Sequence, residues 1–170
     1  MARATVAVAV LGAVYATASA HVEAGDQAVA KRLIGHWSLV SCESVGDGRV
    51  EYPYGQGAVG QLAYDAAGHM TVQIMRPDRS RFASEDVGAG TPAEVSAAFA
   101  GYVAYYGHYS VDESAGVVTH HLEGSWHPNL VGSDQRRYFV LDGDRLTLTT
   151  PPILSQGSKR VFKLVWKRSE

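Results

Sequence analysis

The amino-acid sequence predicts an all-β fold: an eight-stranded antiparallel up-and-down barrel with a short N-terminal helix and one capping helix. Three observations lead to this prediction. Eight segments alternate apolar and polar residues with a period of two, which is typical of half-buried strands. Short connections rich in Asp and Gly follow several of them, as in hairpins between antiparallel strands. Eight strands are also the number that closes into a barrel able to hold one small ligand.

The first residues form a segment separate from the barrel. Arg3 gives it a positive start, residues 6–14 are apolar, and residues 18–20 read Ala-Ser-Ala, an A-x-A cleavage site. We expect a signal peptide over residues 1–20, cleaved after Ala20, and therefore a secreted or periplasmic protein. An uncleaved interfacial anchor is the alternative. The apolar run is too short for a spanning helix, which needs about 20 residues, and no other candidate span follows.

The rest of the chain reads as one domain of strands. Residues 21–31 form a linker and the start of a short helix, predicted over Gln27 to Ile34 to close one end of the barrel, and the barrel domain spans residues 32–170. The predicted strands are Trp37–Glu43, Val59–Tyr64, Met70–Arg76, Tyr105–Asp112, Val117–Glu123, Gln135–Leu141, Arg145–Thr150 and Val161–Arg168.

A second helix interrupts the strands. Thr91 and Glu94 have the spacing of a capping box, and Pro92 occupies the first helical position. Apolar residues then recur at helical spacing: Val95, Phe99, Tyr102 and Val103. We expect a helix from about Pro92 to Ala104 that covers one end of the barrel.

Several motifs resemble those of the bacterial lipocalin-like domain family, a group of small calycin barrels. They are Gly35-His36-Trp37 at the opening of the first strand, Gln73-Ile74-Met75-Arg76-Pro77, Gly90-Thr91-Pro92, Thr119-His120-His121 and residues 128–135. The resemblance covers about residues 32 to 168. It implies a lipocalin-type barrel in which Trp37 packs at the closed end under a basic side chain of the last strand, Lys163, Lys167 or Arg168. It implies no particular reaction, because a fold does not carry function with it.

Composition excludes some classes of partner and of stabilisation. The chain has 170 residues, a net charge of -2 and a pI near 6.4. It therefore lacks the excess of positive charge that is typical of proteins that bind nucleic acid. Its one cysteine, Cys42, cannot form an intrachain disulfide even if export permits one. A buried, inert thiol in the first strand is the expected role of Cys42. Nothing in the sequence indicates the oligomeric state.

One glycine-rich motif suggests a nucleotide but lacks the necessary context. Residues 55–60 match G-x-G-x-x-G by letter, yet that chemistry requires the last glycine to open a helix that receives a pyrophosphate. Here the motif runs into the strand that ends at Tyr64. We interpret the glycines as a flexible entry to that strand, and we expect no cofactor.

Seven histidines, including the pair His120 and His121, suggest a metal. Adjacent residues of a strand point to opposite faces, so this pair cannot chelate one ion together. If Asp112 and Val117 are directly opposed across the hairpin, His108 lies across from His121, and Tyr109 across from His120. This register places His108 and His121 outside the barrel without a clear third ligand, so we expect no metal site.

The same register predicts a largely apolar interior with a few polar groups, as in small-molecule pockets. The candidate ligand-binding residues are Tyr64, Met70, Tyr105, Tyr109, His120, Arg137, Phe139 and Leu148. The alternative is a solid core in which the tyrosines and His120 satisfy one another. Arg137 argues against that alternative, because a buried guanidinium needs a carboxylate or an anion. No inward Asp or Glu is evident, so either the register is wrong or Arg137 awaits an acidic ligand or another partner.

We therefore expect a protein that binds a small, largely apolar molecule with an acidic or hydroxyl group in the barrel lumen. Trp126, in a loop, has room to sit at the mouth. The competing class is a cofactor-independent isomerase or cyclase, with His120 and Tyr109 as an acid–base pair and Arg137 stabilising an oxyanion. No nucleophile motif or paired carboxylates support it. A structural or interaction role is the third possibility and requires a filled lumen.

Overall fold

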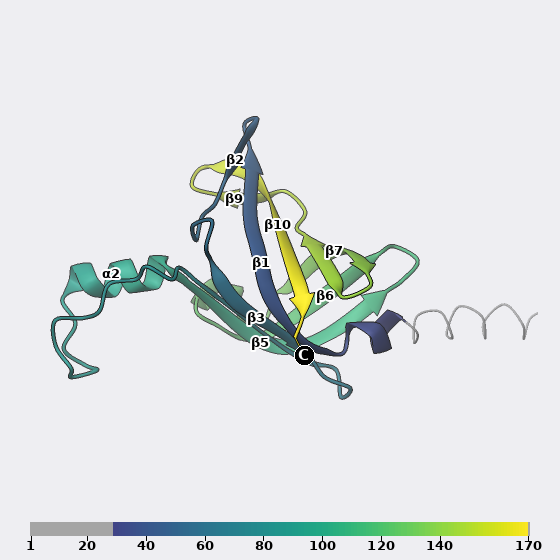
Figure 1. The fold of residues 1–170 in the computed structure, drawn as a ribbon, viewed down its shortest axis with the longest axis horizontal. Helices are drawn as coiled ribbons and strands as arrows, with labels where there is room; N and C mark the ends of the chain where they lie inside the picture. Colours follow the sequence, from purple (N-terminus) through teal and green to yellow (C-terminus); the bar gives the residue numbers. More distant parts are fainter. Residues whose placement is uncertain (1–28, 170) are drawn as a thin grey trace, which may run out of the picture.

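The computed structural model describes residues 29–169 and contains a closed antiparallel barrel (Figure 1). Its strands are β1 Gly35–Gly46, β3 Val59–Tyr64, β4 His69–Met75, β5 Tyr102–Asp112, β6 Val117–Ser125, β7 Asp134–Asp142, β8 Arg145–Thr149 and β10 Ser158–Arg168. Each strand pairs with the next, and β1 pairs with both β3 and β10, which closes the barrel. The eight predicted strands are confirmed. The predicted signal peptide, residues 1–20, lies outside the described residues.

Two further strands extend the sheet and were not predicted. β2, Arg49–Glu51, turns back along the end of β1, and β9, Ile153–Ser155, pairs with the start of β10. Three residues are too few for a period of two to stand out in a sequence. Arg160 of β10, which opposes Ile153 of β9, forms an ion pair of 2.7 Å with Glu51 of β2.

Of the two predicted helices, the second is shorter than predicted. Residues 29–33 are helical, within the predicted range. Helix α2, Pro92–Ala100, has the predicted capping box, in which the Thr91 hydroxyl accepts from the Glu94 amide and the Glu94 carboxylate accepts from the Thr91 amide. It ends at Gly101 instead of Ala104, because Tyr102 and Val103 belong to β5. No helix among residues 29–169 is long and apolar enough to cross a membrane.

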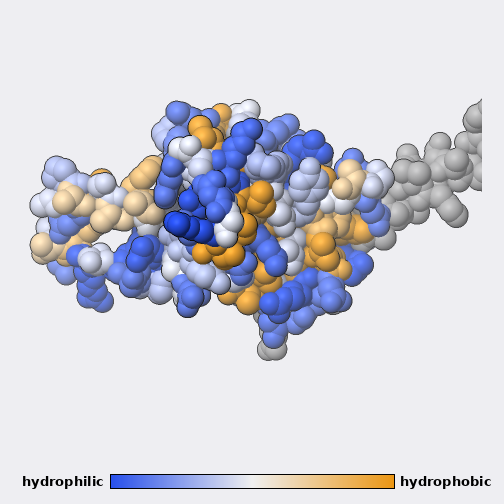
Figure 2. Space-filling view, turned by 90° about the horizontal axis from the view of Figure 1, so that it is seen from above, coloured by the Kyte–Doolittle hydropathy of each residue, from blue (hydrophilic) through white to orange (hydrophobic). Residues whose placement is uncertain are grey.

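The position of α2 corrects the expectation that it covers an end of the barrel. None of its residues is buried, and Figures 1 and 2 both show it on an arm that projects from the body of the molecule. The larger apolar residues assigned to its inner face, Tyr102 and Val103, pair instead with Met75 and Ile74 of β4. The apolar residues that remain in α2 are four alanines, Val95 and Phe99, and the last two are half-exposed. Phe99 contacts Trp126 of the barrel, with ring centroids 6.4 Å apart.

The predicted register between β5 and β6 is confirmed. His108 opposes His121 and Tyr109 opposes His120 between β5 and β6. Leu141 opposes Leu146 and Phe139 opposes Leu148 between β7 and β8. An irregularity not visible in the sequence shifts the β5–β6 register between Tyr106 and Gly107. Glycine is required there, since a Cβ on Gly107 would lie 2.0 Å from the His121 carbonyl oxygen.

Large fully buried side chains gather at the end where β1 begins and β10 ends, here called the closed end. Its fully buried side chains include Leu33, Trp37, Leu62, Leu146 and Trp166. The Trp37 indole N–H donates to the Leu33 carbonyl (2.9 Å). The Arg168 guanidinium lies 4.2 Å from the centroid of the Trp37 ring and donates to the carbonyls of Ile34 and Arg32. Arg168 is thus the basic residue that the family resemblance implied.

Candidate ligand-binding cavity

The other end of the barrel, here called the mouth, holds a cavity of about 480 Å³. Small-molecule sites in proteins usually measure about 300–1,000 Å³. Its walls come from the strand ends distant from Trp37, together with β9 and the loops before β3 and β7. The lining residues are Cys42, Tyr54, Ile74, Val103, Tyr105, Leu122, Trp126, His127, Leu130, Gln135, Arg137, Thr150, Ile153, Leu154, Ser155, Phe162 and Leu164.

These walls are mainly apolar and aromatic. Burial raises the pKa of Tyr54 to about 12 and that of the Cys42 thiol to about 12, with nearby Tyr105 and Glu43 respectively acting in the same direction. Both groups therefore carry no charge at neutral pH, and Cys42 is the inert thiol that the sequence predicts. Arg137 supplies the permanent charge of this wall.

Arg137 has no carboxylate partner within the described chain. Its Nη1 donates to the Arg136 carbonyl at 2.8 Å, and none of the ion pairs among residues 29–169 includes it. The predicted inward position is supported, because Arg137 lines the cavity while Arg136 and Tyr138 are exposed. A half-buried guanidinium with free N–H donors is suited to a ligand oxygen.

A buried hydrogen-bonded group lies behind Tyr105. The Tyr64 hydroxyl lies 2.6 Å from Nε2 of His120, and the Tyr105 hydroxyl lies 3.3 Å from Nδ1. His120 is only 1% exposed and Tyr64 only 2%. Burial lowers the pKa of His120 well below its usual 6.5, and the charges of Arg137 and His121 act in the same direction. Burial also raises the pKa of Tyr64. At neutral pH the side chains of Tyr64 and His120 are therefore uncharged.

The structure separates the eight sequence-predicted residues by depth. Tyr105 and Arg137 line the cavity. Those in the buried layer toward the closed end are Tyr64, Met70, His120 and Leu148. Tyr109 and Phe139 are half-buried against the same core. Alternation along a strand identifies which residues face the interior but not how far they lie from the mouth. The sequence-predicted set therefore contains both cavity-lining residues and residues of the buried core.

The predicted pairing of His120 with Tyr109 as acid and base needs correction. The Tyr109 hydroxyl donates to the Asp65 carbonyl at 3.0 Å, in the β3–β4 turn at the closed end. Its ring packs on Tyr64, with centroids 4.6 Å apart. The hydroxyls that reach His120 are those of Tyr64 and Tyr105. His120 does face inward, a point that the sequence left open.

Most of the cavity wall was not identified from the sequence. Trp126 was expected at the mouth and does line it. Tyr54, Leu130, Ile153 and Leu154 were missed because they lie in loops or in the three-residue strand β9. One signal was available in the sequence: the apolar pair Ile153 and Leu154 follows directly after two prolines. Prolines do not fit inside a central strand, so this pair indicates an apolar segment at the edge of the sheet.

Three histidines line up on the outside of β4, β5 and β6. His69, His108 and His121 occupy successive opposed positions. Each Nδ1 lies within 3 Å of a carboxylate; the pairs are His69 with Asp65 (2.9 Å), His108 with Glu123 (2.7 Å) and His121 with Asp134 (2.6 Å). The outward position of His108 and His121 is confirmed. Within residues 29–169, no three His, Cys, Asp or Glu side chains converge on one point.

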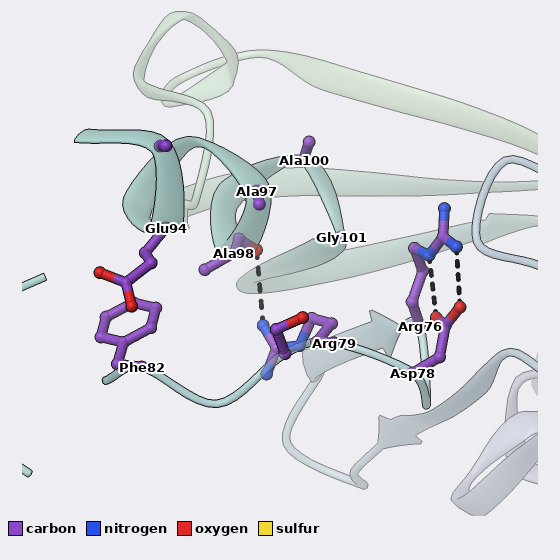
Figure 3. A pocket seen from close by; sticks show the side chains of 11 residues that line it. Arg76, Asp78, Arg79, Phe82, Glu94, Ala97, Ala98, Ala100 and Gly101 are labelled. Atoms are coloured by element: carbon purple, nitrogen blue, oxygen red, sulfur yellow. Dashed lines mark hydrogen bonds and ion pairs between the residues drawn. The ribbon is translucent and has the colours of Figure 1, made fainter. Parts of the chain in front are cut away.

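A second hollow, of about 520 Å³, lies outside the barrel between α2 and the chain that follows β4 (Figure 3). Its charged groups already have partners. Arg76 donates two hydrogen bonds to Asp78, as Figure 3 shows. Arg79 donates to the Ala98 carbonyl at 3.5 Å and lies over the ring of Tyr102. The cavity at the mouth is therefore the stronger candidate for a ligand.

Comparison with known proteins agrees with this geometry. A family model described as a lipocalin-like domain matches residues 34–169. A protein of Aspergillus oryzae named 4′-hydroxy-3′-methoxypropiophenone carrier protein ppsC is 33% identical over 107 residues. That similarity covers 58% of the present chain and 96% of the Aspergillus protein.

Proposed function

This chain belongs to the lipocalin-like domain family, and we propose that it carries a small, largely apolar molecule in the cavity at the mouth of its barrel. The observation that carries the proposal is the cavity itself. It measures about 480 Å³, its walls are mainly apolar and aromatic, and Arg137 is its permanent charge without a described carboxylate partner. Such a surface stabilises an apolar body and orients one polar group.

The relative supports an aromatic ligand. Its name describes the carriage of a one-ring aromatic ketone with hydroxyl and methoxy groups. The present cavity offers Tyr54, Trp126 and Phe162 to such a ring, and flat aromatic faces favour stacked or edge-to-face contacts. The signal-peptide pattern of residues 1–20 leads us to propose also that the carrier acts outside the cytoplasm, as a secreted or periplasmic protein.

The geometry favours carriage over the isomerase or cyclase alternative. A general acid or base must reach the reacting atoms directly or through one water. His120 does not line the cavity, and both of its ring nitrogens already have tyrosine partners. Its lowered pKa also makes it a weak base at neutral pH.

The first test is native mass spectrometry on the protein purified gently from its producing cells, compared with the same sample after denaturation and refolding. A carrier is expected to show a discrete extra mass that denaturation removes. Reconstitution with 4′-hydroxy-3′-methoxypropiophenone then checks the aromatic class. A protein that takes up neither a native ligand nor any aromatic probe contradicts the proposal.

A charge substitution tests the role of Arg137. Arg137→Met removes the guanidinium and keeps much of the apolar stem, so we expect 4-hydroxy-3-methoxybenzoate to bind about 10- to 100-fold more weakly, as for a charge-assisted hydrogen bond. The neutral propiophenone is expected to lose much less. Isothermal titration calorimetry measures both affinities.

Arg136→Met is the matched control, because Arg136 is the adjacent residue of β7 and is exposed. It is expected to leave both affinities unchanged. Equal losses for the acid and the ketone in Arg137→Met would show that Arg137 does not bind the anion.

A further inference from the structure

The hydrogen bonds of His120 define which way its protons point. A neutral imidazole has one N–H donor and one acceptor nitrogen. Nε2 lies 2.6 Å from the Tyr64 hydroxyl and Nδ1 lies 3.3 Å from the Tyr105 hydroxyl. One tyrosine must therefore donate to the ring and the other must accept from it.

Tyr64 decides between the two arrangements. It is buried, and within the described chain its hydroxyl has His120 as its hydrogen-bond partner and no other. If Nε2 carried the proton, the Tyr64 O–H would be left without an acceptor and away from water, which is unfavourable. When Tyr64 donates to Nε2, the proton of the ring sits on Nδ1 and is donated to the Tyr105 oxygen. Every buried proton then has an acceptor.

In this arrangement the proton of the Tyr105 hydroxyl has no acceptor among residues 29–169. Tyr105 lines the cavity, as does Arg137, whose guanidinium makes a single hydrogen bond to a described residue, the Arg136 carbonyl. A hydroxyl that accepts a hydrogen bond is polarised and becomes a better donor. Tyr105 and Arg137 thus each present a hydrogen-bond donor to the cavity, the O–H of Tyr105 and the N–H groups of Arg137.

We propose that Tyr105 and Arg137 form a subsite for an oxygen acceptor, so that the carried molecule is an apolar compound with a ketone or carboxylate oxygen. Tyr64 and His120 are positioning residues, which fix the direction of the Tyr105 hydroxyl without touching the ligand. This inference rests on the proposed carrier function and specifies the ligand class of the same cavity. Hydrocarbons without an oxygen, and protonated amines, would leave both donors unpaired.

Two ligands with the same carbon skeleton test the subsite. Propiophenone has a carbonyl oxygen that propylbenzene lacks, and the full chain is titrated with each by calorimetry. The wild-type protein is expected to prefer the ketone by about tenfold, and Tyr105→Phe to lower that preference at least threefold, as for the loss of one hydrogen bond. Tyr106→Phe is the matched control, since Tyr106 is the adjacent residue of β5, is exposed and does not line this cavity.

The outcomes separate the subsite from the carrier function. Equal binding of the two compounds, or a preference that survives Tyr105→Phe, overturns the subsite and leaves carriage intact. Binding of neither compound contradicts the proposed function and the subsite together.

A measurement without ligand tests the positioning step. Nitrogen-15 NMR of the histidine rings is expected to show His120 with a protonated Nδ1 and an unprotonated Nε2. In Tyr64→Phe, where Nε2 loses its donor, the populations are expected to shift toward the other tautomer and the ketone preference to fall. A wild-type His120 protonated on Nε2 overturns the proposed direction of the hydrogen bonds.

Discussion

At the scale of single residues, burial decides which groups carry charge. His120 lies on the inner face of β6 and is 1% exposed, whereas its neighbour His121 lies outside with a carboxylate partner, Asp134. Desolvation holds the pKa of His120 well below 6.5. One position along a strand therefore separates a buried imidazole, whose pKa is lowered by desolvation, from an exposed imidazole beside a carboxylate.

The depressed pKa of His120 predicts a pH dependence of stability. As pH falls below about 6.5, the unfolded chain binds a proton at His120 that the folded chain does not. Above about pH 6.5 neither state binds this proton, so His120 does not change the free energy of unfolding there. Below it, the free energy falls by up to about 1.4 kcal/mol per pH unit until the folded-state pKa is reached. His120→Gln is expected to flatten this dependence between about pH 7 and pH 5, as measured by urea unfolding.

An exposed histidine provides the control. His36 is exposed at the start of β1, and His36→Gln is expected to keep the wild-type slope. If His120→Gln also keeps that slope, the buried histidine is not the group that titrates.

The residue scale also shows what a sequence can reveal about the site. Register and alternation were enough to predict that Tyr105 and Arg137 face inward. They could not place Tyr64 and His120 one layer deeper, because depth depends on how eight strands tilt and close, a property of no single hairpin. The proton arrangement around His120 could not be predicted either, since it depends on distances between β3, β5 and β6.

At the scale of elements, the two ends of the described chain are joined at the closed end. The last residues of β10 reach the helix at residues 29–33 through Arg168, which lies over Trp37 and donates to the carbonyls of Ile34 and Arg32. These carbonyls lie at the end of the helix, where its last C=O groups lack partners within the helix. A cation there also complements the helix dipole.

Removal of this contact is expected to loosen the closed end. Arg168→Met loses a cation–π contact and hydrogen bonds to two backbone carbonyls, so we expect a loss of about 1–3 kcal/mol in the free energy of unfolding. Lys167→Met is the neighbouring control, because Lys167 is exposed and makes one long ion pair (3.9 Å) with Asp144. Urea unfolding compares the two. Similar small losses for both variants would mean that Arg168 does not hold the helix in place.

The elements differ in how well the sequence predicted them. Strands joined by short Asp- and Gly-containing turns were located closely; the bounds of β3 are those predicted. The end of α2 was misjudged because Tyr102 and Val103 satisfy helical spacing and strand alternation equally well. Pairing with Met75 and Ile74 of β4 decides for the strand, and that pairing is a tertiary contact invisible to a local pattern.

At the scale of the whole molecule, the barrel has a packed half and a hollow half. Large buried side chains fill the closed end, while the mouth holds the cavity and carries the arm with α2. Hydrophobic composition predicted one core but not its uneven distribution. Local stability is expected to follow the same division, since openings cost least where few apolar contacts are lost.

Hydrogen exchange measures this division. Amides of α2, which has no buried residue, are expected to exchange at least about a hundredfold faster than those of β3 around Leu62 and of β10 around Trp166. Exchange followed by mass spectrometry under native conditions gives the rates for each segment. Comparable protection of α2 and β3 would show that the arm is covered in solution, by another chain or by a different packing of its own.

Cys42 provides a site in the cavity wall that can be labelled chemically. It is the sole sulfhydryl of the 170-residue chain, it lines the cavity, and its neutral form is strongly favoured. A thiol-directed reagent can react only after it has entered the same space that a carried molecule fills and after the thiol has ionised there. A bound molecule should therefore protect this sulfur from the reagent. The rate at which Cys42 is labelled then reports how often the cavity is empty and open at the mouth.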